Sequence, residues 1–194
     1  SLPLYLNKLG WKKSVRFYCI TIGVFAILFI PFLSYEFFEN YSSTIGLWFS
    51  KFEFNASVYY FLKWVQAITN GLSLINSMGI IVVCVVTLQT IYLVLKRKKE
   101  TSQLLLMILW VLSGYYFIST TVHPWYIISL LLLSVFTNYK FVLVWSYTLI
   151  LSYLAYNEFS VKESSSVLIL EYTPVILMLA WELYSKKSLK TKAS

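Results

Sequence analysis

The stretch 120–126, which reads TTVHPWY, is among the best suited to chemistry in this sequence. It contains the only histidine. Pro124 is expected to be the first residue of a helix, which places His123 at or near its N-cap, where free backbone N–H groups favour anions. An imidazole with a pKa near ~6.5 can donate a hydrogen bond, carry a proton or contact a phosphate at neutral pH. Two interpretations remain open: an anion-binding site, and a helix-capping histidine beside the interfacial aromatics Trp125 and Tyr126. A metal site is not expected, because one histidine with no nearby cysteine and no aspartate supplies too few ligands.

A second stretch whose residues could take part in chemistry is 51–57, which reads KFEFNAS. In an extended segment, side chains alternate between two faces. Lys51, Glu53 and Asn55 would then share one face, and Phe52 and Phe54 the other. A polar face above an apolar face suits a membrane surface. The alternative interpretation is an interfacial segment whose charges are simply solvated.

The composition sets the class of protein that must position these stretches. Of the 194 residues, 59% are hydrophobic and 12% are charged, and the mean hydropathy is +0.71. A soluble domain carries about twice that charged fraction, so the chain is predicted to be a polytopic membrane protein. The net charge of +8 does not indicate nucleic-acid binding, because the basic residues stand at the ends of apolar runs. Cys19 and Cys84 lie inside such runs and predict neither a disulfide nor a metal site.

The expected fold is an all-α bundle of about six membrane-spanning helices in a single domain, residues 1–194. The predicted spans are 15–33, 75–95, 103–121, 125–136, 141–156 and 167–184. A 19-residue helix rises roughly 28 Å, which is enough to cross the hydrocarbon core. The short fourth run could instead be re-entrant. Two short crossings are favoured because they keep the C-terminal lysines on the cytoplasmic side.

The charge distribution predicts an external face and cytoplasmic termini. Only Lys51, Lys63 and Lys162 among the 16 Lys and Arg residues fall in predicted external loops, as the positive-inside rule requires. The loop 34–70 is expected to form one or two interfacial helices, with Asn55 as a candidate N-cap. This loop, the His123 turn and the loop 157–166 are expected to meet at one surface. Glu171, about one turn into the last span, is a further functional candidate, with external water or Lys162 as its expected partner.

Two of these stretches resemble a known family. The turn 122–126, VHPWY, opening a short helix on the external side, resembles the integral-membrane glycosyltransferases of the C-type (GT-C) superfamily, in particular the polyprenol-phosphate-dependent mannosyltransferases. The stretch 52–60, FEFNASVYY, looks like a second segment seen in bacterial members. The resemblance covers the whole chain in layout, and these two motifs in detail.

The resemblance implies transfer of a sugar, with mannose favoured, from a polyprenyl-phosphate donor to a glycan or glycolipid acceptor on the extracytoplasmic face. No cofactor is expected. It also implies that His123, Lys51, Asn55, Trp125 and Tyr126 bind the donor phosphate, sugar or lipid, since basic groups stabilise charge that develops on a phosphate leaving group.

Members of this family use an acidic general base, typically in the first external loop. This chain has no aspartate and does not begin with methionine. It is therefore expected to be the C-terminal part of a larger enzyme, with the base outside it. The alternative assignment of the base is Glu53.

A non-enzymatic membrane protein, such as a lipid-linked sugar flippase or a transporter subunit, is the second functional hypothesis, and a structural assembly subunit is the third. A transporter is expected to place charged groups at mid-membrane depth, and the predicted spans carry almost none. The expected location is a bacterial inner (plasma) membrane, with the lipid bilayer, the donor and the acceptor as partners.

Overall fold

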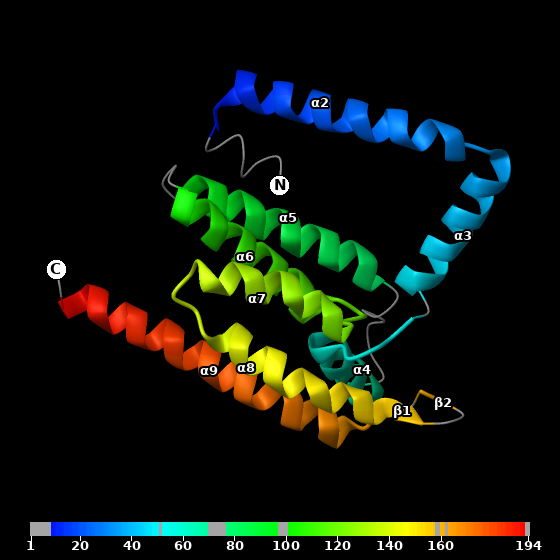
Figure 1. The fold of residues 1–194 in the computed structure, drawn as a ribbon. Helices are drawn as coiled ribbons and strands as arrows, with labels where there is room; N and C mark the ends of the chain where they lie inside the picture. The colour runs from blue at the N-terminus through cyan, green and yellow to red at the C-terminus, as the bar shows by residue number, and fades with distance from the viewer. Residues whose placement is uncertain are drawn as a thin grey trace.

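The computed structural model describes residues 9–50, 52–69, 77–96, 101–157, 160–161 and 163–192. This part of the chain is predominantly helical (Figure 1), which confirms the predicted all-α class. Two-residue strands, β1 and β2, pair antiparallel with Tyr156 opposite Val161. The elements are α2 (Trp11–Phe29), η1 (Ile30–Phe32), α3 (Tyr35–Ser50), α4 (Ser57–Thr69), α5 (Met78–Lys96), α6 (Thr101–Ile118), η3 (Pro124–Tyr126), α7 (Ile127–Val135), α8 (Phe141–Thr148), η4 (Leu149–Ala155), β1 (Tyr156–Asn157), β2 (Ser160–Val161) and α9 (Ser165–Lys192).

Three helical segments of the described chain are long and apolar enough to cross a membrane: Trp11–Phe32, Met78–Lys96 and Ser165–Ser185. The other three apolar helices are shorter, and comprise Gln103–Ile118, Pro124–Val135 and Phe141–Ala155. The helices therefore correspond to all six predicted apolar runs, while their lengths and composition support three spans. That the three short helices also cross the bilayer remains a prediction.

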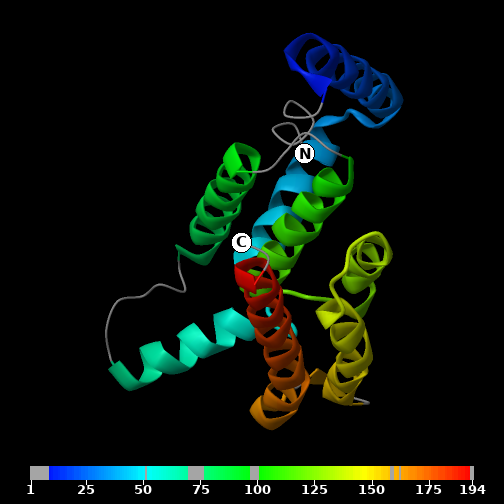
Figure 2. The ribbon, with the colours of Figure 1, turned by 90° about the vertical axis from the view of Figure 1, so that its left-hand side faces the viewer.

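The first span stands apart from the others. None of the most apolar window of Trp11–Phe32 is buried inside the protein, and α2 lies apart from the other helices in both ribbon views (Figures 1 and 2). Exposed apolar side chains such as Phe25 and Ile27 suit contact with lipid tails, which are as apolar as these side chains. The loop predicted to contain one or two helices contains α3 and α4.

The main core lies among α6, α7, α8 and α9. Trp145 of α8 is fully buried and stacks on Phe117 of α6, with ring centroids 4.4 Å apart. Offset-stacked aromatic pairs contribute about 0.5–1.5 kcal/mol beyond the area they bury. The buried members of this cluster are Leu109, Val122, Ile127, Leu130, Phe141, Val142, Trp145, Leu149, Tyr172 and Val175. Because Val122 belongs to this core, the chain next to His123 is fixed in place.

The start of α8 is set by an acidic side chain from α9. The backbone N–H groups of Lys140 and Phe141 donate to the two carboxylate oxygens of Glu182, at 2.7 and 3.1 Å. The first N–H groups of a helix lack partners within the helix, and a negative charge there is favourable. Glu182 is 4% exposed, so this cap joins α8 to α9 in the protein interior.

Candidate functional site

The two stretches singled out in the sequence lie side by side. The N–H of Phe54 donates to the carbonyl of Thr120 at 3.1 Å, and the N–H of Val122 donates to the carbonyl of Phe54 at 2.8 Å. These bonds form a parallel β-bridge between Phe54 and Thr121. The Thr121 hydroxyl adds a bond to the carbonyl of Phe52 at 3.0 Å. The expectation that the loop 34–70 meets the His123 turn is therefore confirmed.

Asn55 is the residue that joins this bridge to α9. Its side-chain Nδ2 donates to Oε1 of Glu171 at 2.8 Å, and its carbonyl accepts from the Tyr172 hydroxyl at 2.7 Å. Its backbone N–H donates to Oε1 of Glu163. Asn55 has a φ of 49°, in the left-handed region that asparagine tolerates better than most residues. Three atoms of Asn55 are thus held by Glu171 and Tyr172 of α9 and by Glu163, two residues before α9 begins.

This conformation corrects two expectations about Asn55. The extended alternation fails, because the left-handed backbone turns the fully buried Asn55 away from the partly exposed face of Glu53. Asn55 is also not the N-cap of α4, which begins at Ser57. The carbonyl of Ala56 accepts the N–H of Tyr60 at 3.3 Å, so Ala56 holds the capping position.

Glu171 has a different partner from the one expected. It is fully buried, away from the external solvent, and it accepts a hydrogen bond from the Asn55 amide. Lys162, the other expected partner, lies outside the described residues, as does Lys51. The position of Lys51 near a donor phosphate stays a prediction.

Glu53 is paired rather than free. Oε2 of Glu53 forms an ion pair with Nζ of Lys63 at 2.6 Å, and Oε1 accepts a hydrogen bond from the Tyr59 hydroxyl. Burial and the neighbouring Glu53 raise the pKa of Tyr59, so this phenol remains a donor at any ordinary pH. Each oxygen of Glu53 thus has one partner and keeps a second lone pair, and its catalytic role stays a prediction.

His123 lies in an aromatic stack. Its ring is 4.4 Å from that of Trp125 with an interplanar angle of 8°, and 5.2 Å from that of Phe54 with an angle of 27°. It occupies the N-cap position of η3, with Pro124 at the next position, but its side chain makes no capping hydrogen bond. The predicted N-cap position of His123 is therefore confirmed, while its side chain does not supply a capping hydrogen bond. Burial lowers the pKa of His123, so at neutral pH the imidazole is neutral and can contact an anion as a hydrogen-bond donor rather than as a charge.

The two aromatic residues after Pro124 are placed differently. Trp125 is 55% exposed and offers its outer face to whatever approaches the stack. Tyr126 is half-buried and stacks on Tyr116 of α6, with centroids 5.8 Å apart. An exposed indole above a buried ring suits an apolar or sugar face, because aromatic rings present large rigid contact areas.

Glu163 is the functional candidate that the sequence did not reveal. It accepts the Asn55 N–H and interacts with Tyr60 of α4, and burial raises its pKa. In the sequence it appears only as one acidic residue of a polar loop, because its partner is 108 residues away. A glutamate two residues before the start of an apolar helix was the one available signal.

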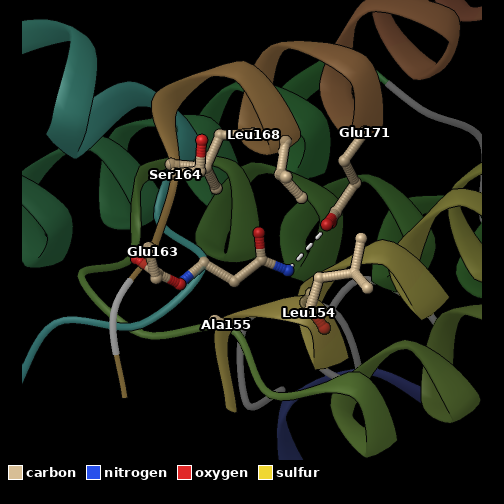
Figure 3. Close-up of a pocket in the computed structure, with 9 residues that line it drawn as sticks. Leu154, Ala155, Glu163, Ser164, Leu168 and Glu171 are labelled. Carbon is tan, nitrogen blue, oxygen red and sulfur yellow. Dashed lines mark hydrogen bonds between the residues drawn. The ribbon is translucent and has the colours of Figure 1, made fainter. Parts of the chain in front are cut away.

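Glu163, Asn55 and Glu171 line a small pocket under α9. In the close-up, Glu163 and Glu171 approach it from two sides, with Leu154 and Ala155 along another wall (Figure 3). Its cavity volume is about 20 Å³, which is room for about one water molecule. It cannot hold a sugar.

A larger cavity lies between α5 and α6. Its volume is about 440 Å³, within the range of small-molecule sites. Most of its lining is apolar, and it reaches Thr120, next to the bridge with Phe54. The lining residues are Gly79, Val82, Val83, Tyr115, Ser119 and Thr120.

Comparison with protein-family models, curated proteins and solved structures gives no match to this chain. Within the described residues, no group of three or more His, Cys, Asp or Glu side chains is arranged to hold a metal ion. The assignment of function therefore depends on the site itself.

Proposed function

We propose that the chain belongs to a membrane glycosyltransferase that transfers a sugar from a polyprenyl-phosphate donor to a glycan or glycolipid acceptor. The observation that supports this most is the bridge between Phe54 and Thr121. It joins the two stretches whose sequences resemble this family, although they are more than 60 residues apart. Chance similarity in two unrelated segments gives no reason for them to share a backbone pairing.

The proposed donor site runs from the aromatic stack to the apolar cavity. Trp125 presents an exposed ring for the sugar, and the neutral His123 donates a hydrogen bond to the phosphate. The cavity that reaches Thr120 takes the first isoprene units. Developing charge on the leaving phosphate is stabilised by such donors in a site that excludes water. Within this chain the candidate general base is Glu53.

We further propose that this site faces the extracytoplasmic side of a bacterial inner membrane. The lysine-rich ends of the spans, including Lys12, Lys13 and Lys96, then lie on the cytoplasmic side. The site with its acidic residues Glu53 and Glu163 lies opposite.

Donor binding tests the proposal without requiring the base. The chain in lipid nanodiscs is titrated with a photoactivatable polyprenyl-phosphate mannose, and labelling is quantified with unlabelled donor as competitor. We expect saturable labelling that falls at least tenfold in the double variant His123→Ala, Trp125→Ala. The exposed substitution Glu39→Gln is the matched control and should leave labelling unchanged.

Two results would overturn the proposal. One is labelling that does not saturate or is not displaced by the unlabelled donor. The other is equal labelling of the double variant and the control, provided both unfold at the same temperature as the parent chain. Movement of the donor between leaflets of proteoliposomes, with no transfer to any acceptor in source membranes, would instead identify a transporter.

A further inference from the structure

The small pocket under α9 contains three oxygen atoms that lack hydrogen-bond partners. They are Oδ1 of Asn55, Oε2 of Glu163 and Oε2 of Glu171, and each is buried. All three residues line the same pocket, and Asn55 and Glu171 are both 0% exposed. A buried polar atom without a hydrogen-bond partner is unfavourable, so three around one cavity indicate a bound ligand that donates hydrogen bonds.

The charge of the pocket limits what that ligand can be. Two carboxylates line it, while the ion pair found among the described residues, Lys63 with Glu53, lies elsewhere. Burying ionised groups without a counter-charge is strongly unfavourable. The groups that act on Glu163 are Tyr60, Asn55 and Glu53, and none of them carries a positive charge. The ligand must therefore bring positive charge or donors, or both.

The volume limits it further. A cavity of about 20 Å³ admits about one water molecule, and a water molecule donates only two hydrogen bonds. A water molecule therefore satisfies two of the three acceptors, and the Tyr60 hydroxyl also acts on Glu163. The two carboxylates still have no counter-charge, and a proton on one carboxyl group removes one of the two negative charges and adds a donor. A divalent cation would need six or more oxygen ligands or several retained waters, for which this cavity has no room.

We propose that this pocket binds one proton together with one water molecule, shared among Asn55, Glu163 and Glu171. The proton leaves the pair with one negative charge, and the water and the acid hydroxyl satisfy the three free oxygens. This assignment rests on the pocket alone and stands whether or not the chain is a glycosyltransferase.

Protonation of this pocket would hold the segment 52–56, and with it the aromatic stack, against α9. Asn55 fixes the position of Phe54, whose ring stacks on His123. When the proton leaves at alkaline pH, two charged carboxylates face each other across Asn55, and the segment 52–56 loosens from α9. The other titratable groups that act on these carboxylates or contact the segment 54–55 are Tyr60 of α4, Glu53 with its partner Lys63, Tyr156 of β1 and Tyr172 of α9.

Infrared difference spectroscopy over a pH titration tests for the proton directly. The chain in nanodiscs should show the carbonyl band of a protonated, buried carboxylic acid at neutral pH, and this band should disappear at alkaline pH. Glu163→Gln combined with Glu171→Gln should abolish it, and Glu39→Gln should retain it. A parent chain without the band at neutral pH overturns the proposal, as does a band that survives in the double variant.

Thermal unfolding provides the second test, and it covers the case in which the double variant fails to fold. Glutamine mimics a protonated glutamate, so Glu171→Gln alone should fold and lose less thermal stability than the parent between about pH 7 and pH 9. A melting temperature of Glu171→Gln that depends on pH as that of the parent does would overturn this role of the proton. Unfolding is also compared with EDTA and with added Na⁺, Ca²⁺ or Mn²⁺. A saturable rise in melting temperature that Glu171→Gln abolishes would assign the pocket to a metal ion instead.

Discussion

Asn55 and Glu171 are 116 residues apart in the chain, and their side chains meet in a 2.8 Å hydrogen bond from Nδ2 to Oε1. Both residues are fully buried. This bond, with those from Asn55 to Glu163 and from Tyr172 to Asn55, ties the loop before α4 to the beginning of α9. The conformation of the proposed donor site therefore depends on a contact between two segments that are far apart in the sequence.

Removing the Asn55 amide should destabilise the fold. Asn55→Ala leaves Glu171 buried without its donor, at a cost of about 1–3 kcal/mol, and adds roughly 1–2 kcal/mol because alanine disfavours a left-handed backbone. Asn55→Gly removes the amide but tolerates the φ of 49°, so it should lose less. Thermal unfolding in nanodiscs measures both. Equal stability of the alanine and glycine variants would contradict the backbone part of this account.

The helices were largely predictable from the sequence, and the contacts of the site were not. The predicted run 125–136 matches Pro124–Val135, and 141–156 matches Phe141–Ala155, because runs of apolar residues define helices whose backbone bonds are local. The partners of Asn55 are not local. Its left-handed φ and its bonds to residues more than 100 positions away leave no periodic signal, so an extended segment was the natural expectation.

Glu182 shows the same limit at the other end of α9. In the sequence it stands just before a lysine-rich tail and looks like a solvated charge. The structure buries it against the N–H groups of Lys140 and Phe141. The pairing of α8 with α9, which no local pattern reveals, decides its role.

Replacing Glu182 should therefore weaken the junction of α8 and α9. Glu182→Ala leaves the N–H groups of Lys140 and Phe141 without their acceptor and should lower the free energy of unfolding by about 2–6 kcal/mol, at about 1–3 kcal/mol for each unpaired group. Glu182→Gln keeps one acceptor oxygen and should lose roughly half as much. The control is Glu39→Ala on α3, whose side chain is exposed and which should stay within about 0.5 kcal/mol of the parent. A Glu182→Ala chain as stable as this control would show that the cap is not needed.

The contact between α5 and α6 depends on a small residue. Nε2 of Gln89 donates to the carbonyl of Trp110 at 2.7 Å, and a Cβ atom added at Gly114 would lie 2.2 Å from Oε1 of Gln89. Gly114→Ala should cost about 1–3 kcal/mol through overpacking. In a Gln89→Ala background the obstacle is gone, and the same substitution should cost less than about 1 kcal/mol.

The double-mutant cycle on Gly114 and Gln89, followed by thermal unfolding, measures this coupling. Gly23→Ala on α2 is the control, because nothing lies within 4 Å of the added methyl group. Additive effects of the two substitutions would show that Gly114 is needed for another reason.

Cysteine accessibility in spheroplasts tests the proposed orientation. In a background with Cys19→Ser and Cys84→Ser, Glu39→Cys should react with a membrane-impermeant maleimide added from outside. Lys140→Cys should react only after permeabilisation, because it lies in the turn between α7 and α8, which is distant from the Phe54 bridge (Figure 1). Both positions are exposed, so access to reagent alone separates them. The reverse labelling pattern would place the His123 site on the cytoplasmic side and would contradict the proposal that sugar transfer takes place on the extracytoplasmic face.

His123 should make the stability of the fold dependent on pH in the mildly acidic range. Burial lowers the pKa of His123 in the folded chain below its value of about 6.5 in the unfolded chain. Above about pH 6.5 neither the folded nor the unfolded chain binds this proton, so protonation of His123 does not lower the free energy of unfolding. As the pH falls below that value, the unfolded chain binds the proton more readily, and this stability is lost toward the folded pKa. Glu163, whose pKa is raised by burial, acts in the opposite direction, so the parent curve alone is ambiguous.

The informative quantity is the difference in the pH dependence of the melting temperature between the parent and His123→Phe. Phenylalanine keeps the stack with Trp125 and Phe54 but cannot be protonated. Melting temperatures measured from pH 7.5 to 5 should fall more steeply in the parent than in the variant, and the two curves should run parallel above pH 7. A steeper fall in the variant would mean that His123 is stabilised as a cation in the fold. A charged partner for the donor phosphate would then replace the neutral hydrogen-bond donor proposed for this residue.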